Sequence, residues 1–408
     1  MLRSLLVTIL LAVPLSHADA DLVPLPAQPS EVPWPTMEWP VGSLPSDMDA
    51  IDFSAAIADA FVKRTPGLGE TREVVIIRGG RLIYERAASG YSTNMRLVSW
   101  SMAKSITQAL VGVAVAQGKI DIDQPMGSPH WSADDRRSQI PWRQWLQMTD
   151  GQRYLEIEAE SIAKSDASRK LFGPGRLDVA SYCAGLPLIH EPGTHWNYNS
   201  CGIVLAADAL TRAIVPNPAS SEQRRSAMMR WMNVSLFDVI GMKPQPEFDA
   251  EGLIYGSALI YASARDFARF GLLYLRDGMW DGRRVLPEGW VDFARTHGTG
   301  TNADIYGAGW WLAPKEGGGR PYPIYVDTGP ERDGFSAQGF EGQYTLVVPS
   351  KDLIIVRLGM TPEKDLRTGA LKDWMGRVAR TFPSVINASS AAAIRSAASQ
   401  PSRSIRGS

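Results

Sequence analysis

The feature that most limits the fold of this chain is the separation of its strand-forming segments. Residues 121–255 are rich in Trp and show no sustained strand pattern. Before them, runs at 73–77 and 82–86 flank the turn Arg78-Gly79-Gly80-Arg81, which is typical of a β-hairpin. After them, strands are expected over 309–313, 340–348 and 352–358. This order predicts that both ends of the chain build one sheet and that the middle forms a separate lobe.

Helical periodicity surrounds these strands. Apolar residues recur at helical spacing over 51–63, and further helices are expected over 101–118, 261–277 and 364–381. The pattern indicates an α/β (α+β) fold in which 51–120 and 256–385 form an α/β lobe and 121–255 form an inserted, mainly helical lobe. A cleft between two such lobes is a natural place for a site.

The first 20 residues have the features of a signal peptide. Arg3 precedes an apolar stretch over 5–15 that is too short to span a bilayer. Small residues at Ala18 and Ala20 suit cleavage after either of them. An uncleaved anchor or a cytosolic N-terminal helix is the alternative. Residues 1–20 therefore predict a periplasmic or secreted protein.

The rest of the composition limits the partners of the chain. The net charge is −1 with no basic block, which argues against nucleic acid as a partner. No later segment approaches roughly 18 unbroken apolar residues, so stable membrane insertion is not expected. Metal-ligand, P-loop and G-x-G-x-x-G motifs are absent from the sequence, so we expect no metal and no cofactor.

Three further segments carry simple expectations. Residues 21–50 are dense in proline and predict an extended lead-in over the surface. Residues 386–408 are of low complexity and predict a disordered tail. Cys183 and Cys201 are the two cysteines, and the spacing permits either one disulfide or two buried thiols.

The segment Ser101-Met102-Ala103-Lys104 opens the apolar helix expected over 101–118. Three residues along a helix is nearly one turn, so Lys104 lies on the same face as Ser101. A serine hydroxyl becomes a nucleophile when a base takes its proton, and a lysine among apolar side chains loses its own proton more easily than in water. The segment indicates a nucleophile with its proton partner, although an isolated S-x-x-K also fits an N-cap and a solvated lysine.

A tyrosine in the middle of the chain is the next candidate. Tyr198 follows His195, Trp196 and Asn197 in a polar and aromatic run. A tyrosine acts as general base where ammonium groups stabilise its phenolate. The alternative is a packed tyrosine whose hydroxyl is satisfied. His195 either lines the cleft or is structural.

A glycine-containing run near the end of the chain is the third candidate. Residues 336–343 include Gly339, and glycines on a strand edge let the backbone approach a bound acyl group. The N–H of Phe340 then joins that of Ser101 in an oxyanion hole. A β-bulge or turn without a catalytic purpose is the alternative.

Together and in this order, these segments resemble the serine β-lactamase and penicillin-binding-protein superfamily. The resemblance runs from about Gly79 to Met360 and is greatest to the class C-like serine hydrolases, which include esterases, D-alanyl-D-alanine peptidases and 6-aminohexanoate-dimer hydrolases. It also covers the stretches 144–151, 261–271 and 281–290. It implies a β-lactamase-like fold with an antiparallel sheet flanked by helices. It further implies Ser101 as nucleophile, Lys104 as its proton partner and Tyr198 as general base and acid.

Two departures from the family pattern bear on the substrate. The family's Tyr-x-Asn would place Asn at position 200, where Ser200 stands, with Asn199 one place early. The family's Lys-Thr-Gly or His-x-Gly is replaced by Ala337-Gln338-Gly339. This replacement removes a cation that would bind the carboxylate of a β-lactam or of D-alanine, so an amide or ester hydrolase is favoured.

The sequence therefore predicts a serine hydrolase that cleaves an amide or ester through a Ser101 acyl-enzyme, with substrate contacts at Ser200, Gly339 and Phe340. The expected partner is a small-molecule amide, ester or short peptide. The alternatives are a D-alanyl-D-alanine peptidase or weak β-lactamase and, from another class, a non-catalytic module that binds cell-wall fragments. The carboxylates at 156, 158 and 160 are expected to be solvated, without support for a paired-carboxylate glycosidase.

Overall fold

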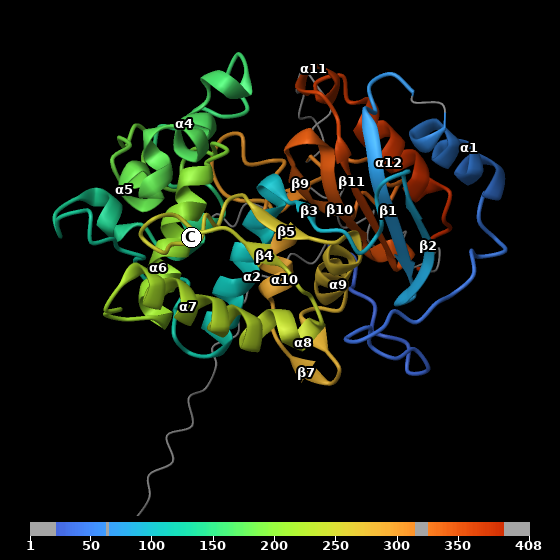
Figure 1. The fold of residues 1–408 in the computed structure, drawn as a ribbon, viewed down its shortest axis with the longest axis horizontal. Helices are drawn as coiled ribbons and strands as arrows, with labels where there is room; N and C mark the ends of the chain where they lie inside the picture. Colours follow the sequence, from blue (N-terminus) through green and yellow to red (C-terminus); the bar gives the residue numbers. More distant parts are fainter. Residues whose placement is uncertain (1–21, 63–64, 315–324, 387–408) are drawn as a thin grey trace, which may run out of the picture.

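One six-stranded antiparallel sheet unites the two ends of the chain. The computed structural model describes residues 22–62, 65–314 and 325–386. The strand order is β2-β1-β11-β10-β9-β8, so the early hairpin lies beside the last strand (Figure 1). The strands are β1 (Glu70–Arg78), β2 (Arg81–Ala87), β8 (Trp311–Leu312), β9 (Phe335–Gly339), β10 (Gln343–Val348) and β11 (Leu353–Met360). The expected leader over 1–20 and the expected tail beyond 386 lie outside the described residues.

Helices cover both faces of this sheet. The helices α1 (Ala50–Phe61) and α12 (Ala370–Arg380) pack on one face, and α2 (Ala103–Ala116) and α9 (Ala264–Leu275) lie on the other (Figure 1). Along β1, side chains alternate between these two cores, so Val74 and Ile76 join the first and Val75 and Ile77 join the second. Because both faces are buried, β1 is a nearly continuous apolar run instead of an alternating one.

The inserted segment 121–255 is mainly helical, and its residues are all described. Figure 1 shows its helices in green beside the sheet, with α2 between them. They are α3 (Trp142–Leu146), α4 (Asp166–Phe172), α5 (Val179–Ala184), α6 (Ser200–Ile214), α7 (Ser221–Met232) and α8 (Asp238–Ile240). A disulfide joins Cys183 to Cys201 and so ties α5 to the start of α6. A loop of this length is worth about 3 kcal/mol in the chain-entropy model.

Short elements complete the fold. A three-stranded sheet has the order β3-β5-β4, and a hairpin joins β6 to β7. Their bounds are β3 (Leu97–Val98), β4 (Gln245–Pro246), β5 (Ile260–Ala262), β6 (Met279–Trp280) and β7 (Arg283–Arg284). Two short helices are α10 (Trp290–Arg295) and α11 (Glu363–Leu366). Within the described residues, none of the helices combines the length and the apolar character that crossing a bilayer requires.

The prediction of a strand over 340–348 was wrong at its start. The strand β10 begins at Gln343, and residues 340–342 form a tight turn in which φ is 59° at Glu341 and 80° at Gly342. The preceding strand β9 was not predicted. Its Ser, Ala, Gln and Gly residues have little intrinsic strand preference, and pairing with β10 holds them in extended form.

Two predicted helices are shorter in the structure. The helix expected over 261–277 begins at Ala264, because Ser263 and Asp266 form a capping box and the residues before them belong to β5. The helix expected over 364–381 is divided into α11 and α12. Gly369, with φ 82°, separates the two.

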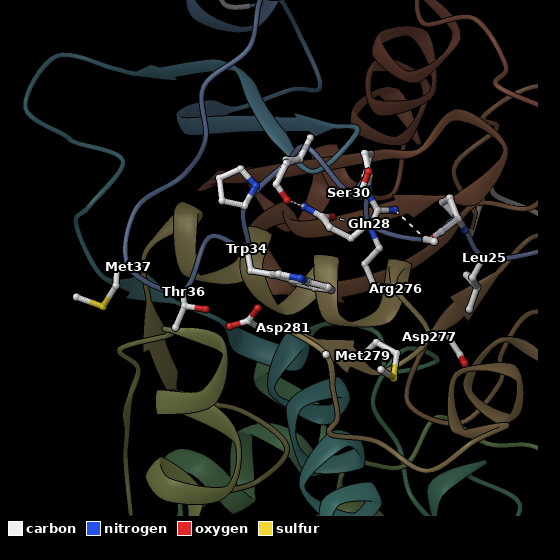
Figure 2. A pocket seen from close by; sticks show the side chains of 16 residues that line it. Leu25, Gln28, Ser30, Trp34, Thr36, Met37, Arg276, Asp277, Met279 and Asp281 are labelled. Carbon is white, nitrogen blue, oxygen red and sulfur yellow. Dashed lines mark hydrogen bonds between the residues drawn. The ribbon is translucent and has the colours of Figure 1, made fainter.

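The proline-rich lead-in lies against the end of α9. The buried guanidinium of Arg276 donates to the side chain of Gln28 (2.9 Å), to the carbonyl of Pro26 (3.2 Å) and to Asp352 (2.6 Å). A hollow of about 830 Å³ lies between this segment and the β6–β7 hairpin, with Trp34 and Asp281 among its lining residues (Figure 2). Its lining contains none of the residues that the sequence marks as site candidates.

Candidate active site

Ser101 lies in a 3₁₀ turn, Trp100–Met102, that leads directly into α2. The α-helix itself begins at Ala103, one short turn later than predicted. Trp100 has φ 43°, in the left-handed region that a bulky side chain rarely adopts. Such a conformation persists only where the surrounding contacts impose it. One of these contacts is the hydrogen bond from the Trp100 indole to the carboxylate of Glu341 (2.9 Å), which ties the turn to the end of β9.

Lys104 lies directly beneath Ser101 on α2. Its Nζ is 2.7 Å from Ser101 Oγ and donates to the carbonyl oxygen of Ser257 (3.1 Å). The residue is only 1% exposed. Burial lowers the pKa of Lys104 to about 8, while the carboxylate of Glu156 acts in the opposite direction. At that pKa roughly a tenth of the side chain is unprotonated at pH 7, so it can accept the hydroxyl proton.

Tyr198 lies beside Lys104, in the segment just before α6. Lys104 Nζ lies 4.8 Å from the centre of its ring, and Trp311 stacks on the ring at 5.1 Å. Burial, with Tyr306 and Glu156 nearby, raises the pKa of Tyr198 well above its usual range, and the interaction of its hydroxyl with Ser101 acts the other way. Tyr198 is therefore a neutral phenol near neutral pH. This state fits a proton donor or relay better than the phenolate base expected from the sequence.

Gly339 brings the end of β9 against the turn that carries Ser101. A Cβ at Gly339 would lie 2.2 Å from the carbonyl oxygen of Ser99 and 3.2 Å from the Cβ of Trp100. Only glycine permits this approach. Phe340 follows, and its ring lies 5.9 Å from the ring of Trp100. The backbone at Phe340 thus lies close to the turn of Ser101.

Ser200 is the first residue of α6 and is buried. Its Oγ donates to Glu156 Oε2 (2.6 Å). Asn199 caps the same helix, because its side chain accepts from two N–H groups of the first turn (2.9 and 3.1 Å) and donates to Asp150 (2.9 Å). The amide of Asn199 is engaged in holding α6, so it does not replace the amide missing at position 200.

Two residues near the nucleophile were missed or misplaced from the sequence. Glu156 was expected to be solvated, and that was wrong, since it is half-buried against Ser200 and affects the pKa of Lys104. Lys170 on α4 was not singled out at all. It is 1% exposed and donates to Ser257 Oγ (2.6 Å). Neither residue stands in a recognisable local pattern, because both reach the site through the tertiary fold.

His195 lies beside this cluster and not within it. Its ring stacks on His190 with centres 4.2 Å apart, and its Nδ1 is 2.8 Å from Thr301 Oγ1. The two histidines help to line a hollow of about 320 Å³ together with Tyr154 and Glu158. Across the described ranges, no three His, Cys, Asp or Glu residues are grouped as metal ligands would be.

Comparison with known sequences places the chain among recognised hydrolases. A family model described as Beta-lactamase matches residues 55–214 and 214–371. A 6-aminohexanoate-dimer hydrolase from Paenarthrobacter ureafaciens is 23% identical over 332 residues. The match covers 76% of this chain and 79% of that relative.

Solved structures show the same architecture. A Bacillus anthracis protein, provisionally named a 6-aminohexanoate-dimer hydrolase, superposes with a TM-score of 0.62 over 87% of this chain and 89% of its own, at 20% identity. A beta-lactamase/D-alanine carboxypeptidase from Pseudomonas syringae superposes with a TM-score of 0.54 over 80% and 97%, at 16% identity. At these identities the likeness concerns the fold, and it confirms the expected β-lactamase-like fold with its antiparallel sheet and flanking helices.

Proposed function

The chain belongs to the beta-lactamase family of hydrolases, and on that premise we propose that it cleaves an amide or ester through an acyl-enzyme on Ser101. The observation that carries the proposal is the buried contact of 2.7 Å between Ser101 Oγ and Lys104 Nζ. Burying an ammonium group costs free energy, so burial favours the neutral amine of Lys104. A lowered lysine pKa is the property that a base for serine needs.

The reaction follows from the protonation states of these groups. Neutral Lys104 takes the proton of Ser101 as Oγ forms a bond to the substrate carbonyl carbon. The N–H groups of Ser101 and Phe340 receive the oxyanion. When the tetrahedral intermediate collapses, the bond to the leaving group breaks, Tyr198 donates a proton to that group, and Lys104 returns a proton to Tyr198. Water then attacks the acyl carbon as neutral Lys104 takes one of its protons. When the second tetrahedral intermediate collapses, the bond to Ser101 Oγ breaks, Oγ receives a proton through Tyr198 and Lys104, and the acid is released.

The walls around Ser101 favour an uncharged substrate. The strand β9 carries no ionisable side chain in the sequence Phe335–Gly339. Aromatic rings lie on the turn of Ser101 and beside Tyr198, since Trp100 packs against Phe340 at 5.9 Å and Trp311 stacks on Tyr198 at 5.1 Å. Such surroundings suit a small amide, ester or short peptide with an apolar acyl group. A D-alanyl-D-alanine peptidase or weak β-lactamase is the second candidate of the same chemistry, supported by the shared fold.

The compartment is part of the same proposal. The disulfide between Cys183 and Cys201 supports an oxidising environment. Together with the expected leader over 1–20, this supports a periplasmic or secreted enzyme.

Covalent labelling of the purified chain tests the proposal. We expect a fluorophosphonate or an activated ester to add one acyl or phosphonyl group that maps to Ser101 by mass spectrometry. Ser101→Ala should abolish both labelling and turnover of a p-nitrophenyl ester. Ser105→Ala is the matched control, because Ser105 lies on the same helix but donates to Gly309 (2.6 Å), and this variant should still be labelled. An adduct on another serine, or a non-catalytic binding module that no probe acylates, would overturn the proposal.

A further inference from the structure

A second buried lysine is joined to Lys104 through a single residue. Lys170 Nζ donates to Ser257 Oγ (2.6 Å), and Lys104 Nζ donates to the carbonyl oxygen of the same Ser257 (3.1 Å). Both lysines are 1% exposed. They come from different parts of the chain, Lys104 from α2 and Lys170 from α4. The mechanism above makes no use of Lys170.

The charges around this pair do not balance two ammonium groups. Glu156 is the carboxylate whose charge acts on both lysines. The neighbouring phenols Tyr154, Tyr198 and Tyr306 are neutral, since burial raises the pKa of each far above the neutral range. On α4 itself, Asp166 is paired with Arg153 and Arg169. One carboxylate facing two buried lysines favours a state in which the pair holds a single proton.

We propose that Lys170 is a positioning residue that acts through Lys104: two positive charges held on one residue, Ser257, repel each other, so the pair gives up one proton near neutral pH and shares the other, and Lys104 takes the proton of Ser101 in the fraction of molecules in which it is neutral. The inference rests on the proposed function, because it assigns the origin of the neutral base in that mechanism. No bond other than those to the shared proton changes in this step.

The pKa values of the two lysines agree with a shared proton. Burial lowers the pKa of Lys170 to about 7, with the charge of Lys104 adding to the effect and Glu156 opposing it. That value already includes repulsion by charged Lys104. Once Lys104 is neutral, this repulsion is gone and the pKa of Lys170 rises. Strongly interacting sites of this kind titrate as a pair, and the remaining proton divides between them.

The pH dependence of Ser101 acylation tests this coupling. In Lys170→Met and Lys170→Gln, the single remaining lysine holds its proton to higher pH. We expect the acid limb of the acylation rate to move upward by about one pH unit, which is the coupling above which two sites titrate as a pair. The rate should therefore fall about tenfold at pH 6 and match the wild type above pH 9, as the same one-unit shift requires. A purely structural role would lower the rate equally at every pH.

Two further variants keep the test decisive. Lys170→Arg retains a fixed charge beside Lys104, so its acid limb should lie at or below the wild-type position. Lys351→Met is the matched control. Lys351 is also buried, but it lies in the turn between β10 and β11 and donates to the carbonyl of Phe382. The pH profile of this variant should equal that of the wild type.

The outcomes separate this inference from the proposed function. If the wild type is labelled at Ser101 but folded Lys170→Met keeps the wild-type acid limb, the coupling is refuted and the hydrolase stands. An acid limb in Lys170→Arg that rises as far as in Lys170→Met also refutes it, since charge would then be irrelevant. If Ser101 of the wild type is not labelled at any pH, the proposed function itself fails. Thermal melts of every variant show that the compared chains are folded.

Discussion

The two walls of the site contribute different kinds of group. The helical wall, defined by Lys104, Glu156, Lys170, Tyr198 and Ser200, consists of titratable or hydroxyl side chains that are buried or half-buried. The strand wall, defined by β9 and Phe340, offers backbone and carries no ionisable side chain. In the proposed mechanism, proton transfer is therefore confined to the helical wall, and alignment of the carbonyl group belongs to the strand wall. A backbone N–H does not titrate, so the strand wall works equally at any pH.

This division follows from how each wall is held. Side chains of the helical wall are fixed by hydrogen bonds, such as that from Ser200 to Glu156 (2.6 Å) and that from Lys170 to the neighbouring Ser257 (2.6 Å). Their charge states depend on one another, so a change at one residue alters the others. The strand wall is held through the backbone, by the pairing of β9 with β10 and by the close approach of Gly339 to the carbonyl of Ser99. The two walls should therefore respond differently to substitution.

The largest effect is expected on the helical wall at Tyr198. Tyr198→Phe removes one hydroxyl and keeps the ring against Trp311, so the stability loss should be about 1 kcal/mol. The kcat/KM for a p-nitrophenyl ester should fall by about 10²–10⁴-fold, the usual value of general acid–base help. Lys104→Ala should be similarly damaging, and the double variant should lose far less than the product of both.

Tyr344→Phe is the control for that comparison. Tyr344 is buried on β10, in the core beneath α1 and α12. Loss of its hydroxyl in Tyr344→Phe should leave turnover unchanged. Thermal melts beside the kinetics separate lost chemistry from unfolding. A folded Tyr198→Phe that keeps more than about a tenth of wild-type activity would show that Tyr198 only packs.

The next effect is expected on the strand wall at Gly339. Gly339→Ala places a Cβ 2.2 Å from the carbonyl oxygen of Ser99, so β9 must move away from the turn of Ser101. A displacement of this kind costs about 10²-fold in kcat/KM. The acid limb of the pH profile should stay where it is, because no titratable group has changed. Gly185→Ala is the control, since its Cβ meets ordinary contacts of 3.4 Å or more. A shifted acid limb in Gly339→Ala would mean that the two walls are not independent.

A smaller effect concerns the substrate that the strand wall accepts. Without a cation on β9, the carboxylate of a β-lactam lacks a charge-assisted contact that is worth roughly 1.5–3 kcal/mol. Nitrocefin should therefore be hydrolysed about ten- to a hundred-fold less efficiently than a small p-nitrophenyl ester. Parallel measurement of kcat/KM for both substrates decides this. A nitrocefin value equal to the ester value would show that a cation outside β9 binds the carboxylate.

The smallest effect on turnover is expected from a carboxyl group of the sheet. Burial raises the pKa of Glu73 on β1 to about 8, with a backbone hydrogen bond from Ala264 acting the other way. The folded state thus prefers the protonated form, so wild-type stability falls as pH rises from the ordinary pKa of 4.5 to about 8. Glu73→Gln stays neutral, and its melting temperature should exceed that of the wild type above pH 8 but not below pH 4. Turnover should be unchanged, and equal melting curves at high pH would contradict the assignment.

Local spacing in the sequence was sufficient to predict the contact between Ser101 and Lys104. Ser101 and Lys104 lie three residues apart ahead of an apolar helix, and a helix brings such residues together whatever surrounds it. The turn between β1 and β2 and the glycine at 339 were recognisable for the same reason, because each is a short-range requirement of the backbone. The union of both chain ends in one sheet also followed, since strand patterns stood at both ends of the chain.

Tertiary structure alone decided the charge state of the site. Lys170 and Lys104 meet at Ser257, which is 87 residues from Lys170 and 153 from Lys104 along the chain, and the charge of Glu156 acts on both lysines. Burial, which sets the pKa values of these groups, depends on every segment packed around them and has no local sequence pattern. The same is true of β9, whose weak strand preference is overridden by pairing with β10, and of the disulfide, since sequence spacing does not determine the distance between Cys183 and Cys201. The contact between Ser101 and Lys104 is thus a property of a few neighbouring residues, whereas the lowered pKa of Lys104 is a property of the whole fold.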